Sequence, residues 1–160
     1  MVEKDDREAK RLLERVMSTT TFENCEERIE KGFNQQAKVL LVSRNVELDG
    51  KNTPWDEWIG TIQSLVILDE VESIEKGALA KFCVLERVTI PASVCSIGTN
   101  LVRECPHLSS ISISPDNQNF SCEDGVLFDF DKTTLISCQT SRTGDYEVPQ
   151  GVVVIGDYAF

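Results

Sequence analysis

The sequence has few of the side chains that assemble into metal or nucleophilic sites. Histidine occurs once, at His107, and no two of the six cysteines stand at the C-x2-4-C spacing of zinc ligands. Cationic residues are also in deficit, because 16 Lys and Arg face 27 Asp and Glu and leave a formal charge of -11. This charge repels phosphate backbones and predicts no nucleic-acid partner. The cysteines are expected to be free thiols that pack as small apolar side chains, and neither a metal nor a cofactor is expected.

Long apolar runs are missing as well. The chain begins Met1-Val-Glu-Lys-Asp-Asp-Arg-Glu, which is not the apolar run of a signal peptide, and no later stretch approaches the roughly 18 apolar residues of a membrane span. No P-loop or G-x-G-x-x-G motif occurs. With 160 residues, 41% hydrophobic and 27% charged, the chain reads as one soluble globular domain without a membrane span.

What the sequence does contain is an internal repeat. Residues 62–113 superimpose on themselves with a shift of 23, and apolar residues return at the same offsets in each unit. The pattern returns once more as Tyr146-Glu-Val-Pro149 and Val152 to Phe160, after a longer third unit. The openings of the first three units are Ile62-Gln-Ser-Leu-Val-Ile67, Leu85-Glu-Arg-Val-Thr-Ile90 and Leu108-Ser-Ser-Ile-Ser-Ile113.

Each unit is predicted to be one short strand and one return turn. The spacing L-x-x-I-x-I has period two, which suits a strand, and Pro91 ends it because proline has no N–H for further pairing. The apolar spacing from Ile97 to Cys105 predicts a single helical or 3-10 turn facing the same interior. A unit this small cannot bury its apolar face alone, so the units must stack into a solenoid.

The unit from Leu85 to Cys105 resembles the BspA-like (Treponema pallidum-type) leucine-rich repeats, whose unit reads approximately L-x-x-I-x-I-P-x-x-V-x-x-I-G-x-x-A-F-x-x-C. It departs at Leu101-Val102, where the family has Ala-Phe, and Ala159-Phe160 restores that form. The first unit departs more, with Leu68, Glu75 and Phe82 in place of Pro, Gly and Cys. The resemblance covers roughly residues 50–160 and implies non-catalytic recognition of a protein or glycan, with surface adhesion as the family role.

The longer third unit, residues 119–136, looks like the hairpin inserted in this family. Its arms are expected at Val126-Leu-Phe and Thr134-Leu-Ile, with Phe130-Asp-Lys at the turn. The compartment is left open: the chain as given fits the cytoplasm, and the family role would place it at the cell surface.

The outward-facing strand positions form the candidate binding site. Period two places alternate residues of adjacent strands on the open, concave face of the sheet, where equivalent positions lie about 4.8 Å apart. These ligand-facing positions are Ser64, Val66, Arg87, Thr89, Ser110 and Ser112.

The chain before the repeat divides into two further parts, so the fold class is α+β: N-terminal helices, then a leucine-rich-repeat solenoid. Residues 1–48 are predicted to form a helical segment, with an amphipathic helix over 3–17, a second over 21–36 and a strand at 39–42. Residues 49–61 are an entry segment, in which Trp55 and Trp58 are expected to cap the apolar end of the solenoid of residues 62–160.

One alternative function is a phosphatase. Asp129-Phe-Asp131-Lys-Thr133 after an apolar strand resembles the D-x-D-x-T motif of haloacid-dehalogenase-like phosphatases, which implies a nucleophile at Asp129, an acid/base at Asp131 and bound magnesium. That family needs a following Rossmann-like sheet, and the remaining residues end inside a repeat. A plain hairpin is therefore favoured, and the protein is not expected to be an enzyme.

Two other groups of side chains could carry chemistry. Cys105 and His107 could form a thiol and base pair, but Cys105 takes a repeated interior offset, so a core cysteine and a loop histidine are favoured. An acidic cluster lacks the D-x-[DN]-x-[DN]-G spacing of a calcium loop and is expected to be a solvated surface. Its members are Asp116, Glu123, Asp124, Asp129 and Asp131.

The last expectations concern the two ends. The fourth unit stops at Phe160, so the chain is expected to be a fragment that self-associates through an uncapped C-terminal end exposing Val152, Ile155 and Phe160. A second alternative function is an intracellular scaffold, in which the N-terminal helices recruit another protein and residues 1–45 alone would capture it.

Overall fold

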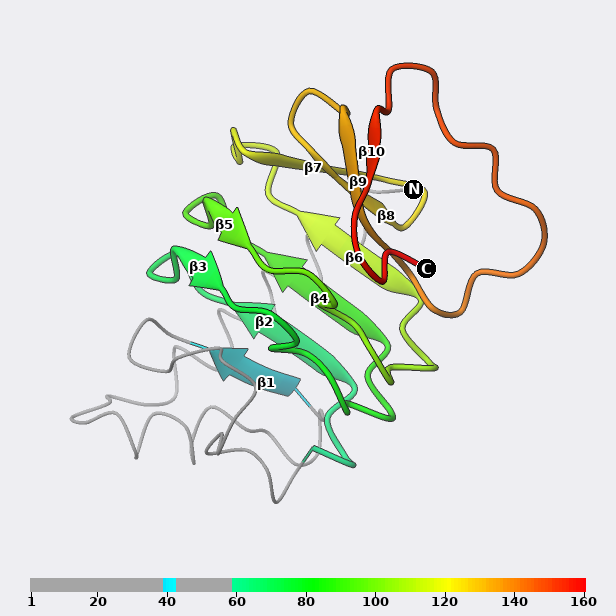
Figure 1. The fold of residues 1–160 in the computed structure, drawn as a ribbon. Coiled ribbons are helices and arrows are strands. Elements are labelled where there is room, and N and C mark those ends of the chain that lie inside the picture. The colour runs from blue at the N-terminus through cyan, green and yellow to red at the C-terminus, as the bar shows by residue number, and fades with distance from the viewer. Residues whose placement is uncertain (1–38, 43–58) are drawn as a thin grey trace.

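The computed structural model describes residues 39–42 and 59–160, and their strands form three sheets (Figure 1). The largest sheet is entirely parallel, in the order β1-β2-β4-β6, and a two-stranded parallel sheet pairs β3 with β5. The third sheet has the order β10-β9-β8-β7. The strands are β1 (Val39–Val42), β2 (Ser64–Ile67), β3 (Ser73–Ile74), β4 (Arg87–Ile90), β5 (Ser96–Ile97), β6 (Ser110–Ile113), β7 (Phe120–Glu123), β8 (Val126–Asp129), β9 (Thr134–Cys138) and β10 (Val154–Ile155).

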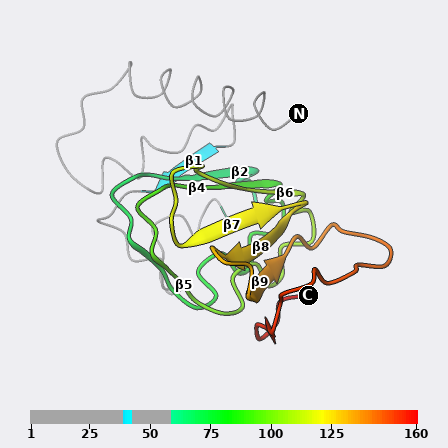
Figure 2. The same ribbon diagram turned by 90° about the horizontal axis from the view of Figure 1, so that it is seen from above.

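The register of the largest sheet confirms the repeat. Leu65 of β2 lies opposite Val88 of β4, and Val88 lies opposite Ile111 of β6. Ile90 and Ile113 form the next pair. Residues 23 apart therefore stack into columns, and the inward positions of β2 and β4 are at most 2% exposed. Seen from above, β2, β4 and β6 lie one behind another (Figure 2), as expected of a stack of equal units.

The return half of each unit completes the core without a helix. The predicted interior positions Val94, Leu101 and Cys105 are buried. The expected helical turn does not form: residues 99–104 make tight turns, and no residue of the described ranges is helical. Asn100 and Glu104 both have φ near +62°, which a right-handed helix does not allow. Backbone groups here bond to the neighbouring unit instead, as Gly77 N–H to Thr99 O and Lys81 N–H to Arg103 O.

Gly98 is required by the close approach of adjacent units. A Cβ at this position would lie 2.4 Å from Lys76 N, a backbone atom of the preceding unit. The Gly98 N–H donates to Ile74 O at 2.8 Å and holds the two turns together. Gly156, at the same offset of the fourth unit, donates to Leu135 O at 2.8 Å and has more room, since its Cβ would lie 3.1 Å from that oxygen.

The third unit carries a hairpin, which confirms the predicted arms. β8 pairs antiparallel with both β7 and β9, and the β8–β9 turn falls at residues 130–133. The link from β7 to β8 was not predicted: Asp124 (φ 50°) and Gly125 (φ 74°) form a two-residue turn with positive φ at both positions. Leu127 faces the main core, whereas Val126 and Phe128 face a second, smaller core.

The fourth unit forms only its return strand. β10 pairs parallel with β9, with Ile155 opposite Leu135. The expected first strand is absent, because residues 145–149 adopt no regular structure. The chain between β9 and β10 instead stands away from the body of the molecule (Figures 1 and 2).

Part of the N-terminal interpretation lies outside the described residues. The two expected helices and the Trp55 and Trp58 cap fall there, and the boundaries at residues 48 and 61 stay predictions. The strand at 39–42 is confirmed, and as β1 it pairs with β2 and joins the sheet of the repeats. No helix in the described part of the chain is long and apolar enough to cross a membrane.

Candidate functional site

The sheet register brings the predicted ligand-facing positions together in two rows, the outward grid. Ser64, Arg87 and Ser110 are opposite one another on β2, β4 and β6. Val66, Thr89 and Ser112 form the second row. Parallel strands in register place such residues about 4.8 Å apart, so the grid is one continuous surface.

Exposure varies across this grid. Arg87 is exposed, and its side chain retains 50% of its accessible surface. Val66 is 9% exposed and contributes little to the surface. The other members, Ser64, Thr89, Ser110 and Ser112, are half-buried. The accessible chemistry is therefore one guanidinium surrounded by small hydroxyls.

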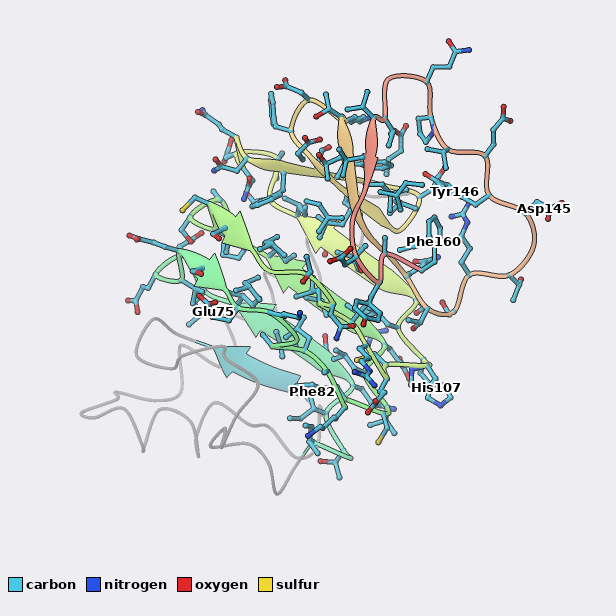
Figure 3. The ribbon with its side chains drawn as sticks, viewed as in Figure 1. Glu75, Phe82, His107, Asp145, Tyr146 and Phe160 are labelled. Atoms are coloured by element: carbon cyan, nitrogen blue, oxygen red, sulfur yellow. The ribbon has the colours of Figure 1, made fainter. Side chains whose placement is uncertain are left out.

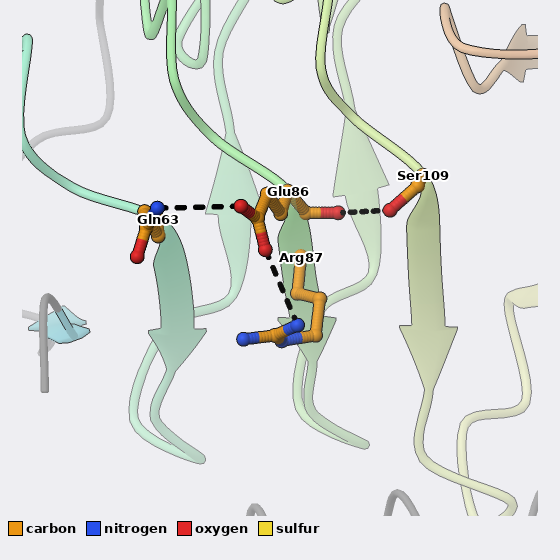
Figure 4. A network of polar contacts seen from close by, with 4 residues as sticks. All are labelled: Gln63, Glu86, Arg87 and Ser109. Atoms are coloured by element: carbon orange, nitrogen blue, oxygen red, sulfur yellow. Dashed lines mark hydrogen bonds and ion pairs between the residues drawn. The ribbon is translucent and has the colours of Figure 1, made fainter.

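A polar row just before the strands positions Arg87. Gln63, Glu86 and Ser109 occupy the same offset of three consecutive units and are linked in Figure 4. Gln63 Nε2 donates to Glu86 Oε1 at 3.3 Å, and Ser109 Oγ donates to Glu86 O at 3.2 Å. Glu86 Oε2 lies 3.4 Å from Arg87 Nη1. Glu86 thus contacts the Arg87 guanidinium at one nitrogen, and half of the Arg87 side-chain surface stays accessible to a ligand.

The two hydroxyl groups of the second row, on Thr89 and Ser112, already form hydrogen bonds within the protein. Thr89 Oγ1 and Ser112 Oγ lie 3.3 Å apart, and Ser112 Oγ donates to Val88 O at 3.3 Å. These bonds fix the hydroxyl positions and leave lone pairs free for a ligand. The arrangement can hydrogen-bond and form one ion pair, but it holds no nucleophile with an adjacent base.

Asp129, the candidate phosphatase nucleophile, stabilises the β8–β9 turn. Its carboxylate accepts hydrogen bonds from Thr133 N at 2.7 Å, Thr133 Oγ1 at 2.6 Å and Thr134 N at 2.9 Å. Slight desolvation acts to raise the pKa of Asp129, but these hydrogen bonds outweigh it and hold the pKa below its usual range. The D-x-D-x-T pattern is thereby explained as turn chemistry, with Asp131 exposed.

Cys105 and His107 do not form a dyad. The Cys105 thiol is buried and donates to Leu79 O at 2.8 Å, while His107 is exposed. Burial raises the pKa of Cys105 to about 11, which disfavours the thiolate needed by a nucleophile. Cys122 is similarly affected by burial, with a pKa raised to about 11. The five cysteines of the described chain are all free; of these, Cys83 and Cys95 are exposed.

The acidic surface of the hairpin is not gathered into a cation site. Within residues 39–42 and 59–160 no group of three His, Cys, Asp or Glu side chains is placed to hold a metal. Glu123 pairs instead with Lys132, at 2.6 Å between Oε2 and Nζ.

Asn117 is an important residue that sequence reasoning missed. It is 3% exposed, and its Nδ2 donates to Pro91 O and to Val94 O, both at 2.9 Å. Its Oδ1 accepts from the backbone N–H groups of residues 119 and 120. Asn117 stands 23 residues after Val94 and so occupies the same position of the next unit. A polar residue at a position that is otherwise apolar was the signal in the sequence that could have identified it.

Apolar side chains are exposed at the C-terminal end of the described chain. Phe160 lies in contact with Tyr146, with ring centroids 6.0 Å apart (Figure 3). Among the predicted exposed residues, Ile155 is 53% and Phe160 67% exposed, whereas Val152 is half-buried. Among residues 59–160, the large exposed apolar side chains are Phe130, Val148, Val153, Val154, Ile155, Tyr158 and Phe160.

The fold is that of a leucine-rich-repeat solenoid. Its parallel strands recur every 23 residues, their apolar residues form buried columns, and short return strands complete the units. Residues 57–160 match the model of the BspA type leucine rich repeat region, with six copies. The chain belongs to this family.

Solved structures extend the comparison. The chain is similar to the pneumococcal vaccine antigen PcpA, with 26% identity and a TM-score of 0.65 over 76% of this chain and 30% of that one. It is also similar to a leucine rich cell surface protein from Faecalibacterium prausnitzii A2-165, with 26% identity and a TM-score of 0.55 over 71% of this chain and 30% of that one. The chain thus spans about a third of the length of these relatives. No curated protein matches it.

Proposed function

We propose that this chain is a non-catalytic recognition module that binds a protein or glycan ligand through the outward grid of the β2-β4-β6 sheet. The observation that carries the proposal is Arg87, an exposed cation fixed by Glu86 among half-buried hydroxyls. A guanidinium that already has a hydrogen-bond partner on the sheet loses less side-chain entropy when it meets an opposite charge on a ligand.

The relatives supply the biological setting of this proposal. One is described as a pneumococcal vaccine antigen and another as a leucine rich cell surface protein, and this chain is similar to part of each. Surface adhesion is the role that this likeness supports. The scaffold alternative depends on residues 1–45, which lie outside the described chain except for β1, and it stays a prediction.

Binding of the purified chain to plates coated with matrix glycoproteins and to a printed glycan array tests the proposal. Arg87→Glu should weaken binding by about tenfold or more, because it places a like charge beside Glu86 and removes the only cation of the grid. Arg103→Glu is the matched control, since Arg103 is as exposed, at 59%, but lies on a return turn. Equal loss in both variants, or no loss in Arg87→Glu at unchanged stability, would move the site off this sheet.

A further inference from the structure

The loop between β9 and β10 (residues 139–153) is the longest connection between two strands within residues 59–160. It stands away from the body of the molecule in both views (Figures 1 and 2). Its residues 143–148 form no backbone hydrogen bond with any described residue, and all of them except Tyr146 are exposed. Exposed segments of this kind are the preferred sites of endopeptidase cleavage, because their N–H and C=O groups are free to bond to the enzyme.

Glu147 has the least constrained backbone among the glutamates of residues 59–160. Neither its own N–H and C=O groups nor those of Tyr146 and Val148 form a hydrogen bond with a described residue. Each of the other glutamates in this range forms such a bond or directly adjoins a residue that does. An endopeptidase draws its substrate into an extended form, so existing backbone bonds must break before cleavage. The Glu147–Val148 peptide bond is therefore the easiest to reach of those that follow a glutamate.

Glu75 shows that an exposed side chain alone is not sufficient. Like Glu147 it is exposed, but its C=O accepts from the Ala78 N–H at 3.1 Å. The preceding Ile74 belongs to β3, and its C=O accepts from the Gly98 N–H at 2.8 Å. Cleavage after Glu75 requires two adjacent units to separate first, whereas cleavage after Glu147 requires no loss of backbone pairing.

Glycines on both sides of Glu147 allow the loop to straighten. Gly144 has φ of 86° and Gly151 has φ of 105°, and a Cβ added at either would meet nothing within 4 Å. Glycines in open space change their backbone angles at little cost. The half-buried Tyr146 faces Phe160, with ring centroids 6.0 Å apart (Figure 3). A single aromatic contact of this kind is weak, so an enzyme can displace it.

Arg142, the cation nearest to this segment, is held much more firmly than Glu147. Its N–H donates to Gln139 O at 3.3 Å, and its Nη1 donates to Asp124 O at 2.8 Å. Its guanidinium also lies 4.6 Å from the centre of the Tyr146 ring. An arginine-specific enzyme would have to withdraw this side chain from its partners to fill the specificity pocket. The Glu147 side chain has no hydrogen bond or ion pair with a described residue, so a glutamate-specific enzyme is favoured.

A cut after Glu147 divides the described chain into two unequal parts. The strands of the outward grid and the whole main core precede it. Of residues 148–160, only Ala159 is buried. These residues are held by β9, through the two-residue pairing of β10 and through the Gly156 N–H, which donates to Leu135 O at 2.8 Å. So short a pairing with so little apolar burial is too weak to retain a separate peptide.

We propose that the Glu147–Val148 bond is a processing site for a glutamate-specific endopeptidase, which releases the chain after residue 147 from the recognition module. The reaction is hydrolysis. Water adds across the peptide bond, the carbonyl carbon of Glu147 becomes a carboxylate, and Val148 becomes a new amino terminus. No oxidant, reductant or further reactant is consumed.

Limited proteolysis of the whole native chain, followed by mass spectrometry, tests the site. A glutamate-specific endopeptidase should make its first cut within residues 59–160 after Glu147, whereas trypsin at matched activity should leave this range intact over the same time. Cuts before residue 59 do not bear on the proposal. Glu147→Gln should slow the cut by about a hundredfold or more, because the specificity pocket loses its charged partner. Glu75→Gln is the matched control and should leave the rate unchanged.

Two results would overturn the site. One is a first cut within residues 59–160 after any other glutamate, or an unchanged rate in Glu147→Gln. The other is equally fast cutting by trypsin after Arg142, which would overturn the assignment to a glutamate-specific enzyme. Size-exclusion chromatography of the cut chain tests the release. The peptide that begins at Val148 should elute separately, and co-elution with the larger part would overturn the release.

The binding assay on matrix glycoproteins distinguishes this proposal from the function proposed above, because cleavage is measured without a ligand. The cut chain should bind within about twofold of the intact chain, since the outward grid lies entirely before the cut. Clearly weaker binding of the cut chain would overturn the separation of the recognition module from the released part. If the intact chain binds none of the ligands but is cut after Glu147, the proposed function fails and the processing site stands.

Discussion

The units from β2 to β6 and the segment from β7 to β10 are both built from short strands, yet they obtain their pairing in different ways. In the first region each strand pairs with a copy of itself 23 residues away, so one sequence pattern determines every contact. In the second region β8 pairs antiparallel with β7 and β9 through tight turns, whereas β10 pairs parallel with β9 after a long loop, and the pattern of the repeat is interrupted. The regular units therefore share one continuous core, whereas the β7–β10 region has a second, smaller core and leaves apolar side chains exposed.

The largest contrast is expected between two isoleucines at the same offset. Ile74 is fully buried and Ile155 is 53% exposed. Ile74→Ala should lower the free energy of unfolding by about 2 to 4 kcal/mol, the usual loss for a buried aliphatic side chain. Ile155→Ala should change it by less than about 0.5 kcal/mol. Urea denaturation of both variants checks this, and similar losses would mean that the fourth unit is as well packed as the first.

The junction between the two regions depends on Asn117. Asn117→Ala leaves two buried carbonyls, of Pro91 and Val94, without their donor and should cost about 3 kcal/mol. Asn119→Ala, at an exposed neighbour, should be nearly neutral. The same denaturation measurement applies. A loss below about 1 kcal/mol for Asn117→Ala would show that water replaces the amide there.

Two glycines at one offset sharpen the comparison. Gly98→Ala forces a Cβ to within 2.4 Å of backbone, so the units must separate, and about 1 to 3 kcal/mol should be lost. Gly156→Ala meets its nearest atom at 3.1 Å and should cost less than about 1 kcal/mol. Gly60→Ala, with nothing within 4 Å, is the control. Equal costs at Gly98 and Gly156 would contradict the tighter stacking of the regular units.

Acid should weaken the hairpin region through Asp129. Its pKa is lower in the folded chain than in the unfolded one, so its stabilisation is present above the unfolded value of about 3.9 and is lost as pH falls through the folded value. Wild type should therefore be more stable than Asp129→Asn at pH 7, by about 1 kcal/mol or less for this partly exposed site, and the gap should close once the pH falls below the folded pKa. Asp131→Asn is the control. A gap independent of pH would contradict the turn-stabilising role.

The smallest expected effect is weak self-association through the exposed apolar residues near β10. Val153 is 80% exposed beside an unpaired edge of the described sheet, and such edges attract other strands. Sedimentation velocity should show concentration-dependent association that Val153→Lys reduces and Gln118→Lys does not. A monomer at all concentrations would contradict the expectation.

Structural features that recur in every unit could be predicted from the sequence, whereas most features that occur once could not. The columns through Val88 and Ile90 followed from offsets alone, and the hairpin arms followed from apolar runs around residue 130. The irregular state of residues 145–149 could not be predicted, because their pattern is that of a strand. Asn117 was missed because an amide becomes structural only when particular carbonyls lie within reach, which no local pattern specifies. For the outward grid, period two predicted which residues share a face, whereas the burial of Val66 depends on three-dimensional packing.

The inserted hairpin also bears on how the chain avoids misfolding. Because successive units are alike, a strand could pair with the wrong copy, slipped by a whole unit, and lose little of its hydrophobic contact. The hairpin occurs at one place in the described chain, and it differs in length from the other units. It has its own Asp124-Gly125 turn, and the Asn117 side chain before it is bonded to the preceding unit. These features fit only one way of pairing the units. If the units paired one repeat out of register, the hairpin would be trapped between two units. The buried carbonyls of Pro91 and Val94 would then lose the Asn117 donor. The interruption thereby gives an otherwise degenerate sequence a unique folded alignment.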